Sequence, residues 1–279
     1  MDLTNGLRIY LCVIAFVFGT VFGSFINCMA WRIAHKESVL KGRSHCAKCG
    51  HILSAADLIP IISYLFLRGR CRYCKDTISP RYMAAEVVCG GGFVLSFLRF
   101  GLSFRTLQII VLFCILLALS LVDFEIYEIP DRFILSGIIW YLASSWMADR
   151  RLNLMGMTVS FLEGGERLSF SAWGTNLLAG MIGGLAIGGG MLVLSLLFDH
   201  VLGKESMGGG DIKLFFMTCL YLGLIQGVFC LILSCIIGLL IAVVMRSGKV
   251  PFGPAISLAA FFSLLYGESC VNWYLSLIM

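Results

Sequence analysis

Residues 9–31 read IYLCVIAFVFGTVFGSFINCMAW, an apolar run that contains no charged side chain. A run of this length matches the roughly 20 residues that an α-helix needs to cross a bilayer. It is too long for the hydrophobic region of a cleaved signal peptide, and it lacks a clean small-x-small cleavage site. We therefore expect a retained first transmembrane helix.

The rest of the chain has the same apolar character. Of its 279 residues, 59% are hydrophobic and 13% are charged, and the mean hydropathy is +0.93. Soluble domains carry about 25% charged residues. The sequence therefore predicts an all-α polytopic membrane protein with about eight transmembrane helices. Beyond the first, the expected spans are 83–99, 105–122, 132–148, 175–198, 212–226, 228–245 and 254–277.

Basic residues gather in one long polar segment, 32–81, which carries ten of the 21 Lys and Arg residues. The positive-inside rule places such a segment in the cytoplasm. Alternation along the chain then also places the links 123–131, 199–211 and 246–253 there, with basic residues divided 15 to 6 in favour of that side. We take the net charge of +5 as a signal of topology. No basic and aromatic surface of the kind that binds nucleic acid stands out.

The same segment contains two Cys-x-x-Cys pairs, in CAKCG and CRYCK. The cysteines are Cys46, Cys49, Cys71 and Cys74. Two such turns, 21 residues apart, suit a structural Zn²⁺ site made of four thiolates. Gly50 follows the first pair, where such a turn often needs a positive φ. The sequence thus predicts a small zinc-binding cytoplasmic loop domain.

Disulfides and a redox Cys-x-x-Cys pair are the alternatives to zinc. A reducing cytoplasm disfavours stable disulfides, and a redox site needs one such pair, not two matched ones. The remaining cysteines are scattered through the expected spans, where we interpret them as small buried apolar residues. They are Cys12, Cys28, Cys89, Cys114, Cys219, Cys230, Cys235 and Cys270.

Two aspartates fall at the ends of expected spans. Asp123 ends the third span in LALSLVDFEIYEIPDRF, and Asp211 begins the sixth in SMGGGDIKLF. The predicted topology puts both at the cytoplasmic membrane face, where ionisable groups are costly and usually functional. Taken alone, each could be an ordinary helix-end carboxylate that caps a helix or pairs with Lys213 or Arg132.

Two acids at one depth favour catalysis. Two carboxylates that share a site hold one proton between them, so one can activate a water while the other acts as an acid. The glycines 208–210 would let a substrate backbone approach Asp211 closely. No G-x-S-x-G or metalloprotease His spacing competes with this interpretation. Glu125, Glu128 and Asp131 are expected in solvent.

Glu86, near the start of the second expected span, is a weaker candidate. Because a charge within an apolar segment is costly, a role in substrate binding or methylation is one interpretation. Simple pairing with a basic neighbour is the favoured one.

Together these motifs resemble the bacterial type IV prepilin peptidases (prepilin leader peptidase and N-methyltransferase), a family of GxGD-type aspartic membrane proteases. The resemblance covers nearly the whole chain. Ala47 and Met83 depart from it, since the family usually has proline at both positions. The matching stretches are GSFINCMAWR, CAKCG, LIPIISYLFLRGRCRYCK, ISPRYMAAE, VDFEIYEIPD, GKESMGGGDIKL and VPFGPAISLAAF.

The resemblance implies that Asp123 and Asp211 are catalytic and that the four cysteines of the two pairs bind the metal. It implies removal of a short basic leader from prepilins or pseudopilins, after a glycine, at the cytoplasmic face of the bacterial inner membrane. Methylation of the new amino terminus with S-adenosylmethionine follows in this family. The implied domains are a first transmembrane helix (1–31), a zinc-binding, methyltransferase-associated loop domain (32–81) and a peptidase domain (82–279).

Two other functions remain open from the residues. A presenilin-like protease would cut within the transmembrane helix of its substrate instead of at the membrane face. A transporter or assembly scaffold would use the loop domain to bind a cytoplasmic partner, but it would leave the aspartate pair without a role.

Overall fold

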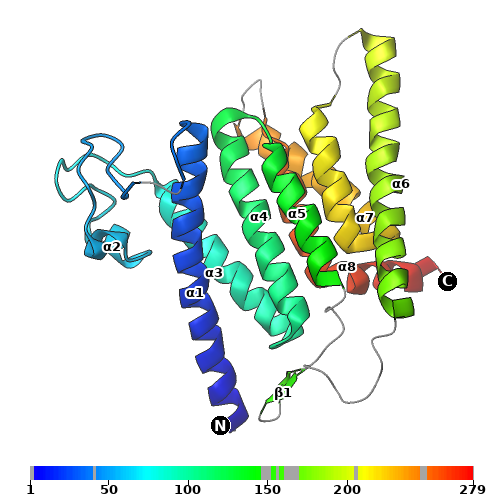
Figure 1. Cartoon of the computed structure of the whole chain (residues 1–279), viewed down its shortest axis with the longest axis horizontal. Helices are drawn as coiled ribbons and strands as arrows, with labels where there is room; N and C mark the ends of the chain where they lie inside the picture. Colours follow the sequence, from blue (N-terminus) through cyan, green and yellow to red (C-terminus); the bar gives the residue numbers. More distant parts are fainter. Residues whose placement is uncertain are drawn as a thin grey trace. The chain divides into compact units, whose positions relative to one another are not determined.

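The computed structural model describes residues 3–39, 42–145, 152–154, 157–159, 170–203, 207–245 and 250–278. It forms two compact units, Met1–Gly101 and Leu102–Met279. The described elements are almost entirely helical (Figure 1). Among these described residues, six helices are long and apolar enough to cross a membrane.

In the first unit, α1 (Leu3–Ala34) packs against α3 (Pro80–Phe100). Small residues allow a close approach of the two backbones, as is common between membrane helices. A methyl group on Gly19 would lie 2.7 Å from the Cα atom of Gly90, and one on Gly23 would lie 2.9 Å from the Cα atom of Glu86. The GxxxG spacing in α1 thus sets this crossing.

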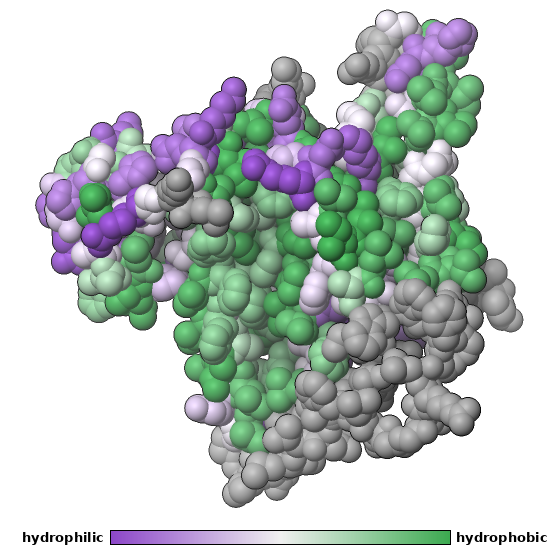
Figure 2. Space-filling view, in the orientation of Figure 1, coloured by the Kyte–Doolittle hydropathy of each residue, from purple (hydrophilic) through white to green (hydrophobic). Residues whose placement is uncertain are grey.

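Between α1 and α3, the described residues form a 3₁₀ turn, η1 (Ala55–Leu58), and the short helix α2 (Ile62–Phe66). Helix α2 exposes large apolar side chains, with Phe66 85% exposed. Figure 2 shows hydrophobic residues over most helix surfaces, while hydrophilic residues gather over this segment and over the connection from α4 to α5.

The described residues of the second unit form five helices and a small hairpin. The helices are α4 (Phe104–Ile126), α5 (Asp131–Ser144), α6 (Phe170–Leu202), α7 (Gly209–Met245) and α8 (Gly253–Ile278). Its core lies where α4 packs on α8, since Leu112, Leu116 and Leu119 of α4 and Ile256 of α8 are almost fully buried. The strands β1 (Leu152–Leu154) and β2 (Met157–Val159) pair antiparallel.

Helix α7 is two helices joined by a sharp turn. Its 37 residues would form a straight rod of about 56 Å, well beyond a hydrocarbon core of about 30 Å. Gly223 breaks it, with φ 69° and ψ −171°. A methyl group on Gly227 would lie 3.0 Å from Sγ of Cys219, whereas residues eight apart in a straight helix are about 12 Å apart. The chain therefore folds back at Gly223.

The structure confirms the all-helical membrane class, and each of the eight expected spans is helical in its described residues. Within the described residues six helices reach the length of a span, because the sixth and seventh expected spans are the two parts of α7 and the fourth corresponds to α5, which has 14 residues. The β1–β2 hairpin was not predicted. The end of the fourth expected span and residues 204–206 and 246–249 of two links lie outside the described residues.

The turn in α7 yields a test. The backbone conformation of Gly223 is accessible essentially to glycine alone, so we expect Gly223→Ala to destabilise the protein by about 1–3 kcal/mol. Thermal unfolding in lipid nanodiscs, followed by circular dichroism, would measure this. Gly190→Ala in α6 is the matched control, because a methyl group there meets no atom within 4 Å. Equal midpoints for the two variants would contradict a strained turn.

Candidate functional site

The carboxylate of Asp123 lies where α4 meets the start of α8. Asp123 is 4% exposed, and its Oδ2 atom accepts a hydrogen bond of 3.0 Å from the backbone N–H of Gly253. Gly253 is the first residue of α8. The first N–H groups of a helix lack partners within the helix and carry its positive dipole end. The start of α8 therefore binds a buried carboxylate that the end of α4 supplies.

Asp211 lies in the first turn of α7, where the helix dipole also favours a negative charge. Its backbone N–H donates to the carbonyl oxygen of Gly208, at 3.0 Å. The nearby cations are engaged elsewhere: Nζ of Lys213 lies 2.7 Å from Oδ1 of Asp131, and Arg132 lies over the ring of Phe133. Within the described part of the chain, no ion pair accounts for either Asp123 or Asp211.

One cavity of about 450 Å³ contacts both aspartates. Its remaining walls come from the α4–α5 connection, the start of α7 and the residues before α8. They are Tyr127, Glu128, Ile129, Asp131, Gly208, Gly210, Lys213, Val250, Pro251 and Phe252. Glu125, Glu128 and Asp131 are exposed, as expected. The fold thus brings together two carboxylates that are far apart in the sequence.

The three glycines before Asp211 have different surroundings. A methyl group on Gly208 would lie 3.3 Å from Oδ2 of Asp211, and one on Gly210 would lie 2.9 Å from Cβ of Ile129. Gly209 has no atom within 4 Å of that position. Gly208 therefore leaves space beside the carboxylate, while Gly210 allows α7 to pack against the α4–α5 connection.

Sequence reasoning missed Gly253. A methyl group there would lie 2.7 Å from Oδ2 of Asp123, so the position needs both the N–H and the absence of a side chain. The stretch VPFGPAISLAAF contains the residue, but a backbone donor has no side-chain signature.

The four cysteines of the first unit converge. Their Sγ atoms all lie within 4.8 Å of one another, and those of Cys46 and Cys74 are 4.0 Å apart. A tetrahedral site with zinc–sulfur bonds of about 2.3 Å has sulfur–sulfur edges of about 3.8 Å. The donor set therefore fits a zinc ion, and all four cysteines are free thiols.

Each Cys-x-x-Cys pair sits in a small turn of the same design. The N–H of Cys46 donates to the carbonyl oxygen of His51, and the N–H of Cys71 donates to that of Asp76. A residue with positive φ follows each pair: Gly50 at 69° and Lys75 at 60°. The expectation for Gly50 is confirmed, and a lysine takes the same conformation in the second turn.

The crowded sulfurs do not ionise alike. Burial alone would raise the pKa of Cys46, but hydrogen bonds from the backbone N–H groups of Cys49 and Lys48 lower it to about 7. The backbone of Asp76 lowers the pKa of Cys74, but burial and the other three sulfurs outweigh it and raise that pKa to about 11. A divalent cation would compensate four thiolates, and its binding would release protons.

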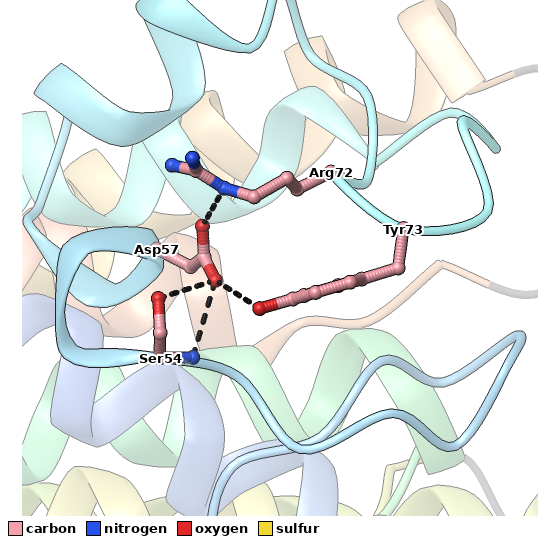
Figure 3. Close-up of polar contacts among 4 residues, drawn as sticks. All are labelled: Ser54, Asp57, Arg72 and Tyr73. Atoms are coloured by element: carbon pink, nitrogen blue, oxygen red, sulfur yellow. Dashed lines mark hydrogen bonds and ion pairs between the residues drawn. The ribbon is translucent and has the colours of Figure 1, made fainter.

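Asp57 ties the second turn to the segment between the two pairs (Figure 3). Its nearly buried carboxylate accepts hydrogen bonds from Ser54 Oγ at 2.7 Å, Arg72 Nε at 2.6 Å and Tyr73 Oη at 3.2 Å. The bond from Ser54, followed by the contact with Arg72, lowers the pKa of Asp57 to about 2. Since that pKa is depressed, the contact stabilises the fold at pH values above about 4 and is lost as the pH falls through about 2.

Glu86 is 8% exposed and lies in α3, in the wall of a cavity of the first unit. Its Oε2 atom accepts a hydrogen bond of 2.7 Å from the backbone N–H of Ile61. Among the described residues, no basic side chain forms an ion pair with it. The basic partner that would have given it a simple structural role is therefore not found in this part of the chain.

Comparison with known proteins identifies the class. Residues 17–100 match the bacterial peptidase A24 N-terminal domain, and residues 110–243 match the type IV leader peptidase family. The chain belongs to the type IV leader peptidase family.

Several characterised relatives match along almost their whole length. A prepilin leader peptidase/N-methyltransferase of Bacillus subtilis (strain 168) is 32% identical over 271 residues, which cover 95% of this chain and 98% of the relative. The enzyme of the same name from Pseudomonas putida is 30% identical, over 93% of this chain and 92% of the relative. An Escherichia coli O78:H11 protein named “Type 4 prepilin-like proteins leader peptide-processing enzyme” is 30% identical, over 90% of this chain and 93% of the relative. No solved structure matches the chain.

The cysteine cluster yields a second test. We expect the purified protein to contain about one zinc per chain and Cys71→Ser to lose most of it, because a tetrahedral site with three thiolates binds far more weakly. Elemental analysis by mass spectrometry would measure the metal. Limited proteolysis should then cut the segment between α1 and α3 faster, since metal-binding energy is local folding energy.

Cys12→Ser is the control for that experiment, since Cys12 lies in α1 outside the cluster. Full zinc retention in Cys71→Ser, with unchanged proteolysis, would show that these sulfurs do not hold the ion.

Proposed function

We propose that this protein is a membrane aspartic endopeptidase that removes the leader from type IV prepilins or pseudopilins. The observation that carries the proposal is the single cavity that Asp123 and Asp211 share. Family membership and the printed names of the relatives support the same substrate class. The multi-pass helical architecture supports a location in the bacterial inner membrane.

The proposed reaction uses both carboxylates of the cavity. Two acids in one site hold a single proton between them. The ionised acid removes a proton from a water molecule that attacks the scissile carbonyl, and the protonated acid donates to the leaving nitrogen. The hydrogen bond from Gly253 fixes the orientation of Asp123, and Gly208 leaves room for the substrate backbone beside Asp211.

We further propose that cleavage occurs at the cytoplasmic membrane face, after a glycine that follows a basic leader. The cluster of ten basic residues in 32–81 supports this sidedness through the positive-inside rule. The position of Asp123 near the end of α4 and of Asp211 in the first turn of α7 supports a cut at a membrane face, not within a span.

Methylation of the new amino terminus by S-adenosylmethionine is the second proposed activity. The relatives named as N-methyltransferases support it, as does their near-complete overlap with this chain. We propose that the four cysteines hold a structural zinc ion that pins the loop domain. The division into 1–31, 32–81 (methyltransferase-associated) and 82–279 remains a prediction.

Two rival functions can be separated from this one. A presenilin-like protease would cut a substrate within its helix, so the site of cleavage distinguishes the two. A transporter or assembly scaffold would keep its activity when either aspartate becomes asparagine.

The aspartate pair yields a third test. We expect Asp123→Asn and Asp211→Asn each to abolish cleavage of a prepilin by the membrane-embedded protein, because the shared-proton arrangement needs both acids. The double variant should be no worse than either single variant, since residues that act as a unit fail together. Mass spectrometry of the products would detect both cleavage and methylation.

Methylation of an already cleaved peptide is the internal control and should persist in these variants. Near-normal cleavage by Asp211→Asn would make Asp211 an ordinary helix-end carboxylate and would refute the mechanism.

A fourth test probes the start of α8. We expect Gly253→Ala to lower the rate of cleavage by about tenfold to a hundredfold, because a methyl group 2.7 Å from Oδ2 must displace the carboxylate of Asp123. Gly190→Ala in α6 is the matched control, since its methyl group meets no atom within 4 Å. Cleavage rates measured on one prepilin should separate the two variants; equal rates would show that the contact does not position Asp123.

A further inference from the structure

The first unit contains a cavity of about 710 Å³ that the peptidase site does not use. It lies wholly within residues 21–86, so α1, the cysteine segment and α3 form it together. Its volume lies within the 300–1,000 Å³ typical of small-molecule sites. Aromatic side chains line it, including Trp31, Tyr64 and Tyr82.

Glu86 places a carboxyl group in the wall of this cavity. Its carboxylate has a backbone donor in Ile61 and, within the described part of the chain, no ion pair. A buried ionised carboxylate costs several kcal/mol unless an opposite charge compensates it. A cationic ligand in the cavity would supply that charge.

The other charges in the cavity wall have partners within the protein. The guanidinium group of Arg32 donates to the carbonyl oxygens of Ser38, Val39 and Gly42 at 3.2–3.3 Å, which holds the chain that follows α1. Asp57 is paired with Arg72, and Nζ of Lys48 lies 3.9 Å from Oδ2 of Asp76. Glu86 therefore differs from these groups, and the place for a cation in this cavity is beside Glu86.

The contact with Glu86 also fixes an unusual backbone. Ile61 has φ 59° and ψ −51°, and the N–H of Ile62 bonds to the carbonyl oxygen of Pro60, which together define a γ-turn with positive φ. This conformation is rare and costly for a β-branched residue. Such strain persists where the surroundings impose it, commonly at ligand sites. Glu86, which binds this turn, and Tyr64, three residues after Ile61, both line the cavity.

We propose that this cavity binds S-adenosylmethionine, with the adenine against the aromatic wall and the sulfonium facing Glu86. The assignment rests on the proposed methyltransferase function. Every base has a face that stacks on aromatic side chains, so adenine fits this wall. When bound, the ligand supplies its methyl group: the S–CH₃ bond breaks with its electron pair left on sulfur, an N–CH₃ bond forms at the new amino terminus, and that nitrogen releases a proton to solvent.

Charge then distinguishes the donor from its product. The sulfur is positive in S-adenosylmethionine and neutral in S-adenosylhomocysteine, while the rest of the two molecules is the same apart from the methyl group. An interaction between Glu86 and the sulfonium therefore stabilises the donor more than the product.

The test measures binding of both molecules to the full-length protein in lipid nanodiscs by titration calorimetry. We expect Glu86→Gln to weaken binding of S-adenosylmethionine at least tenfold and that of S-adenosylhomocysteine less than threefold. Glu37→Gln is the matched control, since Glu37 is exposed and lies outside the cavity. It should bind both as the wild type does. Thermal unfolding and zinc content would show whether each variant is folded.

A second variant keeps the proposal testable if Glu86→Gln fails to fold. Ser24 lies in the cavity wall beside Glu86, so Ser24→Phe fills space and removes a hydroxyl group that hydrogen-bonds Glu86, without changing the net charge. We expect it to weaken binding of both molecules at least tenfold.

Three results would overturn the assignment. One is wild-type affinity for S-adenosylmethionine in folded Glu86→Gln and Ser24→Phe. Another is photochemical cross-linking of the donor to residues 102–279 instead of 21–86. The third is a copurifying phospholipid in this cavity that the donor fails to displace.

Assaying methylation of an already cleaved peptide distinguishes failure of the cavity assignment from failure of the proposed methyltransferase function. If the wild-type protein methylates the peptide while the variants bind the donor normally, only the cavity assignment is refuted. A wild-type protein that neither binds the donor nor methylates refutes the proposed methyltransferase function and the cavity assignment with it.

Discussion

The candidate active site depends on one hydrogen bond, from the N–H of Gly253 to the buried carboxylate of Asp123. It joins the end of α4 to the start of α8 and satisfies an N–H group that α8 itself leaves without a partner. Phe252, the residue before Gly253, holds the start of α8 in place. It packs closely against Gly238 of α7: a methyl group on Gly238 would lie 2.5 Å from the ring of Phe252. The position of Asp123 therefore depends on packing among α4, α7 and α8.

Hydropathy and spacing predicted much of this arrangement for physical reasons. A bilayer requires long apolar helices, so the expected spans correspond to helices wherever the structure describes them. Four thiolates in two Cys-x-x-Cys turns can surround one ion only by converging, and their sulfurs do lie together. An ionisable group at the end of a span is costly and indicates function. Asp123 and Asp211 both lie at such ends, and the fold places them on one cavity.

The remaining features depend on backbone geometry, which side-chain patterns do not encode. Gly253 acts through its N–H, and Ile61 acts through a turn that its side chain disfavours. Gly223 reverses α7 inside an uninterrupted apolar stretch, so hydropathy located the hairpin only approximately. The contact of Asp57 with Arg72 and Tyr73 joins residues far apart in an irregular segment, where no periodicity gives a signal.

Three carboxylates among the described residues are nearly buried and bonded to backbone N–H groups, yet their surroundings differ. Asp57 also contacts Arg72, so its charge is compensated within the fold, as suits a structural role. Asp123 and Glu86 have backbone donors but, among the described residues, no cation. A protein keeps a buried, uncompensated acid at a cost. That cost is offset where the acid exchanges a proton, as we propose for Asp123, or where a cationic ligand supplies the missing charge, as we propose for Glu86.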